Sequence, residues 1–390
     1  MPNLSEVAEI NPRLDRSLID DMSESVSFVP MANVSELLGA ITSEEDRKIS
    51  DVIKGFTTFQ DRDVLVAKIT PCFENGKIAH ARIGRRLGFG STEFHVVRPK
   101  ASRLNDRYLY HFLRQPVVRE DGERRMTGSA GQKRVPKAFL EALEIPLPPL
   151  AEQRRIAAIL DKADALRAKR REAITKLDQL LQSVFLEMFG DPETNPKRWP
   201  IGVIGDLLES VKYGSSEKAA LEGDVPILRM NNLTYAGEID LTHLKYISEE
   251  KAEEKHQVRS GDILFNRTNS KELVGKTAVY AGPTPMAYAG YLVRGRTRRG
   301  QSPEYISGFL NSSYGKTTLQ GMCKSIVGMA NINAREFAAI AIPLPPSDLQ
   351  KTFQSQVSCI RSRRDMLKRQ SDLFGHLFAS LQHRAFAGTL

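Results

Sequence analysis

Two polar segments have side chains that could contact nucleic-acid bases. Residues 70–77 follow a predicted strand at 63–69, and residues 265–276 follow the matching strand in the second half of the chain. Asn and Arg match the hydrogen-bonding edges of adenine and guanine, while Lys binds phosphate. The candidates are Thr70, Asn75 and Lys77 in the first segment and Asn266, Arg267, Thr268, Asn269, Ser270 and Lys276 in the second. Because Asn and Gly also favour turns, ordinary turn chemistry is the alternative for each segment.

Further basic and polar side chains extend this set. The net charge is +9 and the isoelectric point is near 9.4, an excess that favours a polyanionic partner. The candidates are Arg82, Arg85, Arg86, Arg124, Arg125, Gln132, Lys133, Arg134, Arg294, Arg296 and Asn331. For any single one of these arginines, a solvated surface position is the alternative to a phosphate contact.

No catalytic or metal-binding motif stands out. Residues 275–277 and 315–317, both Gly-Lys-Thr, resemble the end of a P-loop, but Ser270 and Leu310 stand where that motif requires glycine. The seven His residues lack the paired spacing of metal ligands, and there is no Gly-x-Ser-x-Gly nucleophile motif. The sequence therefore predicts a non-catalytic chain that binds no metal, although a dispersed active site remains an alternative.

A repeat divides the chain into two similar halves. Ile-Pro-Leu-Pro-Pro occurs at residues 145–149 and again at 342–346, an offset of 197. Weaker matches keep the same order at offsets of 197 to 199, such as Gly-Lys-x-Ala at 76–79 and 275–278. A repeat of this length indicates a duplicated structural unit. We therefore predict an α+β protein with two tandem mixed α/β domains, at residues 1–144 and 191–341.

Local patterns supply elements for these domains. β-branched, partly alternating stretches predict strands at 64–69, 94–97, 262–265 and 278–280. Helices are expected at 106–113 and 303–310, and frequent Gly and Pro predict many turns elsewhere. The order of the strands within a sheet does not follow from these patterns.

Each domain is followed by a long charged helix, within residues 145–190 and 342–390. Good helix formers dominate residues 151–188, which contain neither Pro nor Gly. About 37 such residues make a helix roughly 55 Å long. The predicted heptad positions are Ile156, Ile159, Leu166, Leu177, Leu180 and Val184 in the first helix and Phe353, Ile360, Leu367, Phe374 and Leu381 in the second. We expect the two helices to pair antiparallel as an intramolecular coiled coil with pseudo-twofold symmetry. The alternative is that each helix folds back on its own domain.

Composition narrows the class of protein. No apolar run approaches the ~20 residues that span a bilayer. The N-terminus lacks a signal-peptide pattern, and the three scattered Cys residues support neither a disulfide framework nor a zinc site. We expect a cytoplasmic protein that does not enter the membrane.

One combination of motifs carries a family resemblance. The run IPLPPLAEQRRIA at 145–157 continues through LDQLLQSVF at 177–185 to MFGDP at 188–192, and NPKRWP follows at 195–200. Together with the two polar segments, these runs closely resemble specificity subunits of type I restriction–modification enzymes. The resemblance covers essentially the whole chain. It is weaker after the second Pro motif, where Ser-Asp-Leu-Gln-Lys replaces the Ala-Glu-Gln-Arg of the first.

The resemblance implies a function and partners. Each domain would be a target-recognition domain that reads one half of a bipartite sequence in double-stranded DNA, and the helices would set the spacing. The subunit would be non-catalytic. It would bind two adenine methyltransferase subunits and ATP-dependent restriction subunits, with S-adenosylmethionine, ATP and Mg bound by those partners. The alternatives are a standalone sequence-specific DNA-binding adaptor and the specificity subunit of an orphan methyltransferase.

Overall fold

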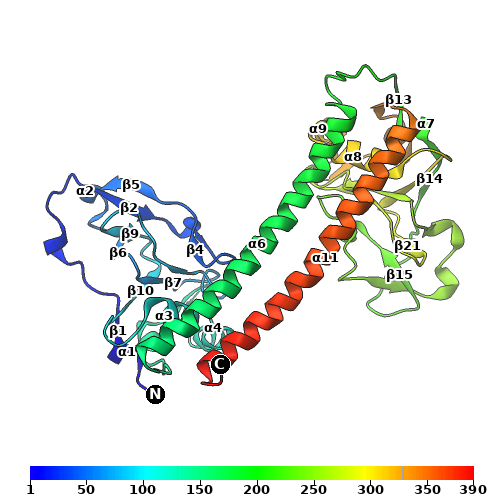
Figure 1. Ribbon diagram of the computed structural model, residues 1–390. Helices are drawn as coiled ribbons and strands as arrows, with labels where there is room; N and C mark the ends of the chain where they lie inside the picture. Colours follow the sequence, from blue (N-terminus) through cyan, green and yellow to red (C-terminus); the bar gives the residue numbers. More distant parts are fainter. Residues whose placement is uncertain (130, 327–328) are drawn as a thin grey trace. The chain divides into compact units, whose positions relative to one another are not determined.

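The computed structural model describes residues 1–129, 131–326 and 329–390 (Figure 1). The chain forms two compact units, one of Met1–Arg171 with Arg369–Leu390 and one of Glu172–Lys368. Two 40-residue helices, α6 (Leu150–Phe189) and α11 (Ser347–Phe386), each contribute one half to each unit. The predicted α+β class, with two mixed domains and two long helices, is confirmed. The domain boundaries placed beside the Pro motifs stay predictions.

The first unit contains two four-stranded sheets. Strands β1 (Ala8–Ile10), β10 (Phe94–Pro99), β7 (Val64–Ala67) and β8 (Ile78–His80) form an antiparallel sheet in that order. Strands β5 (Glu45–Lys48), β2 (Ser25–Val29), β9 (Gly88–Gly90) and β6 (Thr57–Phe59) form the second, in which β2 and β9 run parallel. Strand β7 is buried along its whole length, as its apolar sequence predicts.

The second unit repeats this topology strand for strand. One sheet has the order β14 (Leu208–Tyr213), β22 (Leu292–Thr297), β18 (Ile263–Asn266) and β20 (Thr277–Val279). The other has the order β16 (Lys245–Ile247), β15 (Val225–Leu228), β21 (Met286–Tyr288) and β17 (Gln257–Val258), with β15 and β21 parallel. The sequence repeat is therefore a repeat of the fold.

Shorter elements complete each unit. The first has α1 (Leu4–Val7), α2 (Ile49–Val52), α3 (Asp106–Leu113), α4 (Pro116–Arg124), α5 (Lys137–Glu141), the hairpins β3–β4 (Val34–Ser35, Ala40–Ile41) and β11–β12 (Thr127–Ser129, Gln132–Arg134), and 3-10 turns at Arg16–Leu18 and Met31–Asn33. The second has α7 (Ile204–Leu207), α8 (Pro303–Asn311), α9 (Ser313–Met322), α10 (Ala334–Ala338), the pair β13–β25 (Ile201–Val203, Ala341–Pro343), strands β19 (Thr268–Asn269), β23 (Lys324–Ile326) and β24 (Met329–Asn331), and 3-10 turns at Met230–Asn232, Glu249–Lys251 and Glu254–His256.

Contacts between side chains repeat as well. The Tyr108 hydroxyl donates to the carbonyl oxygen of Pro146 at 2.9 Å, and the Tyr305 hydroxyl donates to that of Pro343 at 2.6 Å. In each unit this bond ties the equivalent helix, α3 or α8, to the Pro motif. Both tyrosines are buried, so each bond also satisfies a polar group in the core.

Local sequence explains where the long helices begin and end. Pro148 and Pro149 precede α6, and the N–H groups of Glu152 and Gln153 donate to the Pro149 carbonyl in its first turn. At the other end, Gly190 has a φ of +81°, a conformation that glycine adopts without strain and that commonly terminates helices. Proline just before a helix and glycine just after it are the expected boundary signals.

In the first unit, the start of α6 and the end of α11 share one hydrophobic core. Ile156 and Leu160 of α6 are buried together with Phe378 and Phe386 of α11. Leu166, which was predicted to face the other helix, is 42% exposed. In α6 the next large buried residue after Ile156 is therefore Leu160, four residues further on, and not the predicted Ile159, three residues further on.

The second unit shows the same shift. The Phe185 and Phe189 rings of α6 lie 5.7 and 5.2 Å from the ring of Phe353 of α11, whereas Leu180 is 42% exposed. Its neighbour Leu181 packs against the core instead. The predicted heptad is thus correct at Ile156 and Phe353, which are buried, but one residue out of phase at Leu166 and Leu180. The other predicted positions, Ile159, Leu177, Val184, Ile360, Leu367, Phe374 and Leu381, are half-buried.

Candidate nucleic-acid interface

In the first unit, the polar segment that follows β7 lies against the β11–β12 hairpin. The Thr70 N–H donates to the Lys133 carbonyl at 3.0 Å, and the Val135 N–H donates to the Lys68 carbonyl at 2.8 Å. The Thr70 hydroxyl donates to Glu74 Oε1 at 2.8 Å, which fixes the turn after the strand. The side chains of Gln132 and Lys133 are exposed on the hairpin. The structure therefore brings two of the predicted segments together on one surface.

Arg134, at the base of this hairpin, is paired within the unit. Its Nε and Nη2 atoms each lie 2.9 Å from a different oxygen of Glu93. This two-pronged hydrogen bond lowers the pKa of Glu93, so the carboxylate is ionised at neutral pH and offsets the arginine charge. Lys133 is exposed at the neighbouring position of the hairpin, while Arg134, whose side chain is 42% exposed, is paired with Glu93 beside strand β10.

The second unit has a matching surface. Strand β19 follows β18 and pairs with β24, and the Ile332 N–H donates to the Arg267 carbonyl at 2.9 Å. The Thr268 hydroxyl donates to Asn331 Oδ1 at 2.9 Å. Arg267, Thr268, Asn269 and Asn331, all predicted from sequence, are thus brought together. Residues 130, 327 and 328 lie outside the described residues.

Two tyrosines that the sequence did not single out flank Arg267. The guanidinium carbon of Arg267 lies 4.9 Å from the centre of the Tyr213 ring, and the main-chain N–H of Arg267 donates to the Tyr291 carbonyl at 3.0 Å. Tyr213 is 44% exposed and Tyr291 is 55% exposed. The exposed Tyr213 ring beside this arginine offers stacking and hydrogen bonding at once. Neither tyrosine lies in an element that the sequence predicted, so no signal in the sequence marked them.

Some predicted contacts are inside the fold instead. Asn266 is 0% exposed and Arg294 is 3% exposed, and Arg294 Nη1 donates to the Gln257 carbonyl at 2.6 Å. Arg296 donates to both oxygens of buried Asp262, at 2.7 and 2.8 Å. In this fold the side chains of Asn266 and Arg294 are not available to DNA, and Arg296 is held by a carboxylate. These residues were predicted to contact bases or phosphates because the partners that hold them inside the fold lie far away in the sequence.

The two lysines of the Gly-Lys motifs have the same structural role in each unit. Lys77 Nζ donates to the Met31 carbonyl at 3.2 Å, and Lys276 Nζ donates to the Met230 carbonyl at 2.7 Å. Burial lowers the pKa of Lys276. Each lysine therefore caps a 3-10 turn of its own unit. This structural role explains why both repeats have a lysine here, and no phosphate contact is needed to explain it.

The remaining candidates lie away from the two surfaces or at their margins. Arg85 pairs with Asp46 at 2.8 Å, Arg86 with Asp20 at 3.8 Å, and Arg125 with Asp121 at 3.2 Å. Arg82, Arg124 and Asn75 are exposed, whereas Ser270 is half-buried and its N–H donates to Asn269 Oδ1 at 2.9 Å. Residues 82–86 connect β8 to β9, and Arg124 ends α4, so neither group belongs to the hairpin surface.

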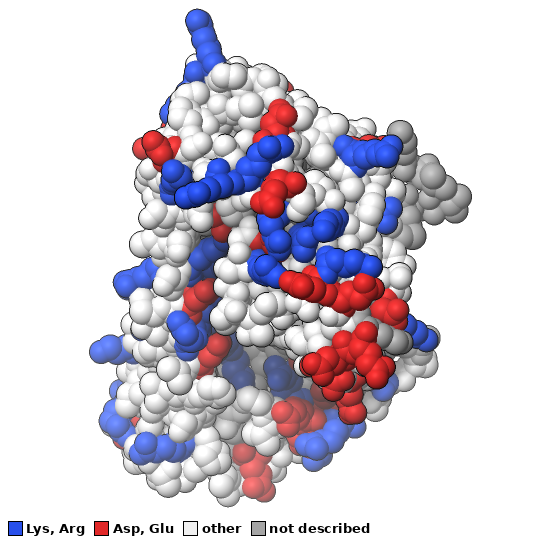
Figure 2. All heavy atoms as spheres, turned by 90° about the vertical axis from the view of Figure 1, so that its right-hand side faces the viewer, with Lys and Arg blue, Asp and Glu red and all other residues white. Residues whose placement is uncertain are grey.

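Charge is mixed on the face drawn in Figure 2, where basic side chains alternate with acidic ones. The excess of +9 is therefore not concentrated in a single basic field on that face. Within the described part of the chain, no three His, Cys, Asp or Glu side chains are grouped as metal ligands. None of the described helices is both long and apolar enough to cross a membrane.

Comparisons with known proteins agree with this architecture. Residues 2–176 match the family model of the type I restriction modification DNA specificity domain. The EcoAI specificity subunit of Escherichia coli is 41% identical over 46% of this chain and 31% of its own length. The EcoKI specificity subunit of Escherichia coli (strain K12) is 25% identical over 81% of this chain and 72% of its own length. A chain from a solved structure on complex assembly and conformational transition of the type I R-M system has a TM-score of 0.61 at 19% identity, covering 100% of this chain and 97% of that one.

The repeated α+β units and the two long helices thus form a fold that is shared with a solved chain of a type I R-M system. The chain is similar to specificity subunits of type I restriction–modification enzymes, the resemblance that its motifs predicted. The chain spans about a third of the length of the first curated relatives that it matches, 31% and 30%.

Proposed function

We propose that the chain is the non-catalytic DNA-recognition subunit of a type I restriction–modification complex. Each unit reads one half of a bipartite target in double-stranded DNA, the first through residues near Thr70 and Lys133 and the second through residues near Arg267 and Asn331. The observation that carries this proposal is the repetition of one polar surface on two copies of one fold. The two surfaces occupy equivalent positions but differ in side chains, as two readers of different sequences require.

The proposal includes partners and their cofactors. Two adenine methyltransferase subunits bind the chain, and ATP-dependent restriction subunits join the complex. S-adenosylmethionine, ATP and Mg belong to those partners.

Co-expression tests the recognition role directly. The chain is expressed with an adenine methyltransferase encoded beside it, and N6-methyladenine is mapped across the host genome. A bipartite methylated sequence that disappears without the chain is expected. A stable complex should also co-purify, and its absence would contradict the proposal. Replacing residues 1–144 with the same domain of a relative should change one half of that sequence only, because each surface is contained in one unit.

Helix length provides a second test. Four residues inserted after Lys169 lengthen α6 by about 6 Å. Because B-DNA rises about 3.4 Å per base pair, the gap between the two half-sites should grow by one or two base pairs with both half-sites unchanged. A four-residue insertion is absorbed by coiled coils as a stutter. If the insertion mutant keeps full activity and its original spacing, the long helices do not set the distance.

A further inference from the structure

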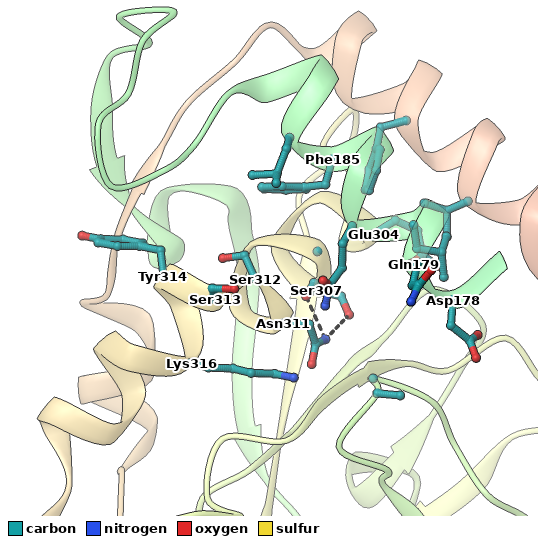
Figure 3. A pocket seen from close by; sticks show the side chains of 18 of the residues that line it. Asp178, Gln179, Phe185, Glu304, Ser307, Asn311, Ser312, Ser313, Tyr314 and Lys316 are labelled. Atoms are coloured by element: carbon teal, nitrogen blue, oxygen red, sulfur yellow. Dashed lines mark hydrogen bonds between the residues drawn. The ribbon is translucent and has the colours of Figure 1, made fainter. Parts of the chain in front are cut away.

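The second unit contains a cavity that has no sequence motif to mark it. It has a volume of about 370 Å³ and lies between α6, α8 and α11 within that unit. In Figure 3, Phe185 and Gln179 of α6 and Glu304 and Ser307 of α8 surround the same space. The Phe353 ring of α11 also lines it. This volume falls in the range of small-ligand pockets, roughly 300–1,000 Å³.

The first unit fills the corresponding place with its own side chain. At the offset that relates Tyr108 to Tyr305, Tyr110 of α3 corresponds to Ser307 of α8. The Tyr110 ring is buried, and its hydroxyl donates to the Gly39 carbonyl at 2.9 Å. Arg114 stacks on that ring at 5.0 Å, whereas its counterpart is the shorter Asn311. The second unit therefore lacks an aromatic ring and an arginine at a position where the fold can hold both.

The cavity wall offers hydrogen-bond acceptors. Glu304 is 9% exposed, and its Oε1 accepts from Arg361 Nη1 at 2.6 Å. Among the described residues, no donor is bonded to its second oxygen, Oε2. Asn311 turns its amide nitrogen toward the Ser307 and Thr277 carbonyls, both at 2.9 Å, which leaves its carbonyl oxygen as an acceptor. Burial raises the pKa of Glu304, and the Arg361 charge opposes that effect. A buried carboxylate with one partner favours a further donor.

We propose that this cavity binds a planar aromatic nitrogen heterocycle that carries an N–H donor. The ring packs against Phe185 and Phe353, and its N–H donates to the Glu304 carboxylate. Nothing in the recognition of DNA requires this site, so the inference goes beyond the proposed function and can fail without it.

Matched small probes test the chemistry on the full chain. Benzimidazole has the ring and the N–H, whereas 1-methylbenzimidazole has the ring without the N–H. Binding is followed by ligand-observed NMR at mildly alkaline pH, where both probes are uncharged. Benzimidazole should bind at least about tenfold more tightly, since a hydrogen bond to a charged group is lost with the methyl group. No binding of benzimidazole, or equal binding of the two probes, overturns the proposal.

Two variants locate the probe. Ser307→Tyr places in the cavity the ring that the first unit has and should abolish binding of both probes. Ser362→Tyr, on an exposed position of α11, is the matched control and should leave binding unchanged. Glu304→Gln keeps the shape of the cavity and should remove the preference for benzimidazole. Folding of each variant is checked by the emission of Trp199, which lies in this unit and is the single tryptophan of the chain. If Ser307→Tyr does not fold, Glu304→Gln with the two probes decides the matter.

The ring that occupies the cavity in the cell can be a free small molecule or part of a partner's side chain. Wild-type chain and Ser307→Tyr distinguish these two sources. A free heterocycle should be released when wild-type chain from its own host is denatured and should be found by mass spectrometry, but not from Ser307→Tyr. A ring on a partner's side chain should release nothing, and instead Ser307→Tyr and added benzimidazole should both weaken co-purification of the methyltransferase. If neither result is obtained, the cavity has no natural occupant and the inference is wrong.

Discussion

Gln153 and Gln350 occupy the same place in the two repeats and anchor the two long helices by the same hydrogen bonds. Gln153 Oε1 accepts from the Asn105 N–H at 2.8 Å, and its Nε2 donates to the Pro148 carbonyl at 2.8 Å. Gln350 Oε1 accepts from the Ser302 N–H at 3.1 Å, and its Nε2 donates to the Pro345 carbonyl at 3.0 Å. Asn105 and Ser302 cap the N-termini of α3 and α8. Each amide therefore joins a long helix, a Pro motif and a neighbouring helix cap.

Gln350→Leu should destabilise the second unit. The substitution keeps the size of the side chain but leaves a buried N–H and a buried carbonyl without partners, each worth about 1–3 kcal/mol. We expect a loss of a few kcal/mol, measured by urea unfolding followed through Trp199 emission. The control is Gln356→Leu, which is exposed on the same helix and should change stability by less than about 0.5 kcal/mol. Equal effects of the two substitutions would mean that the bonds contribute nothing.

Leu160 and Leu166 of α6 differ in burial, so their replacement by Ala should differ in its effect on stability. Leu160 is 0% exposed, so Leu160→Ala should cost about 2–5 kcal/mol by leaving a cavity. Leu166 is 42% exposed, and Leu166→Ala should cost well under 1 kcal/mol. Thermal unfolding monitored by circular dichroism compares them. A larger loss at Leu166 would restore the three-residue spacing that the sequence first indicated.

Substitutions of Lys133 and Lys276 should have different effects, the first on DNA binding and the second on stability. Lys133 is exposed on the hairpin, so Lys133→Ala should weaken binding to all DNA sequences and reduce the slope of log affinity against log salt by about one. Lys276→Ala removes a bond to a main-chain carbonyl and should lower stability while leaving that slope unchanged. Fluorescence anisotropy at several salt concentrations, with the assembled methyltransferase, measures the slope. A reduced slope for Lys276→Ala alone would reverse these assignments.

Arg267→Ala should affect recognition by the second unit only. Its guanidinium lies on the Tyr213 ring at the predicted surface, where a base contact is worth roughly 1–3 kcal/mol of discrimination. Methylome sequencing of the variant should show relaxed specificity in one half of the target. The control is Arg296→Ala, which breaks the pair with Asp262 and should lower stability without changing the sequence that is methylated. Relaxation in both half-sites would rule out Arg267 as a reader of one of them.

The first unit should lose stability as pH falls below neutral. His95 is buried, its Nε2–H donates to the Val135 carbonyl at 2.9 Å, and its Nδ1 accepts from Asn11 Nδ2 at 3.0 Å. Burial lowers the pKa of His95 below its unfolded value of about 6.5. The unfolded chain therefore binds a proton first, and stability present above that pH is lost as the pH falls toward the folded pKa.

His95→Gln tests this dependence. The loss is limited to about 1.4 kcal/mol per pH unit for one proton. Urea unfolding followed by circular dichroism between neutral and mildly acidic pH should show a shallower slope for His95→Gln than for wild type. His376→Gln, at an exposed position of α11, should keep the wild-type slope. An unchanged slope in His95→Gln would show that this histidine binds protons equally in the folded and unfolded states.

Strong local signals explain which parts of the fold were predictable. The stretch predicted as helix at 106–113 is α3, and the Pro and Gly signals give the ends of α6 closely, because such boundaries depend on neighbouring residues. The phase of the long helices was not predictable. Ile159 stands beside Leu160 and Leu180 beside Leu181, so either stripe is apolar and only the globular core selects one.

The candidate site was predictable in outline for a similar reason. The two polar segments were identified because they follow strong strands. By contrast, the burial of Asn266 and Arg294 and the bonding of Lys276 to Met230 arise from partners dozens of residues away. Tyr213 and Tyr291 were missed because an isolated tyrosine carries no signal of exposure. The cavity beside Glu304 was missed because it results from side chains that are absent.

The sharing of each long helix between two units bears on the ancestry of the protein. A primitive chain of one repeat would have had one globular unit and one helix, with half of that helix in its own core and the other half uncovered. Two such chains could cover each other's free halves by exchange, forming a symmetric dimer with two identical polar surfaces. Fusion of two copies into one gene frees each copy to diverge, so a single polypeptide can come to carry two different surfaces, as the two units do here.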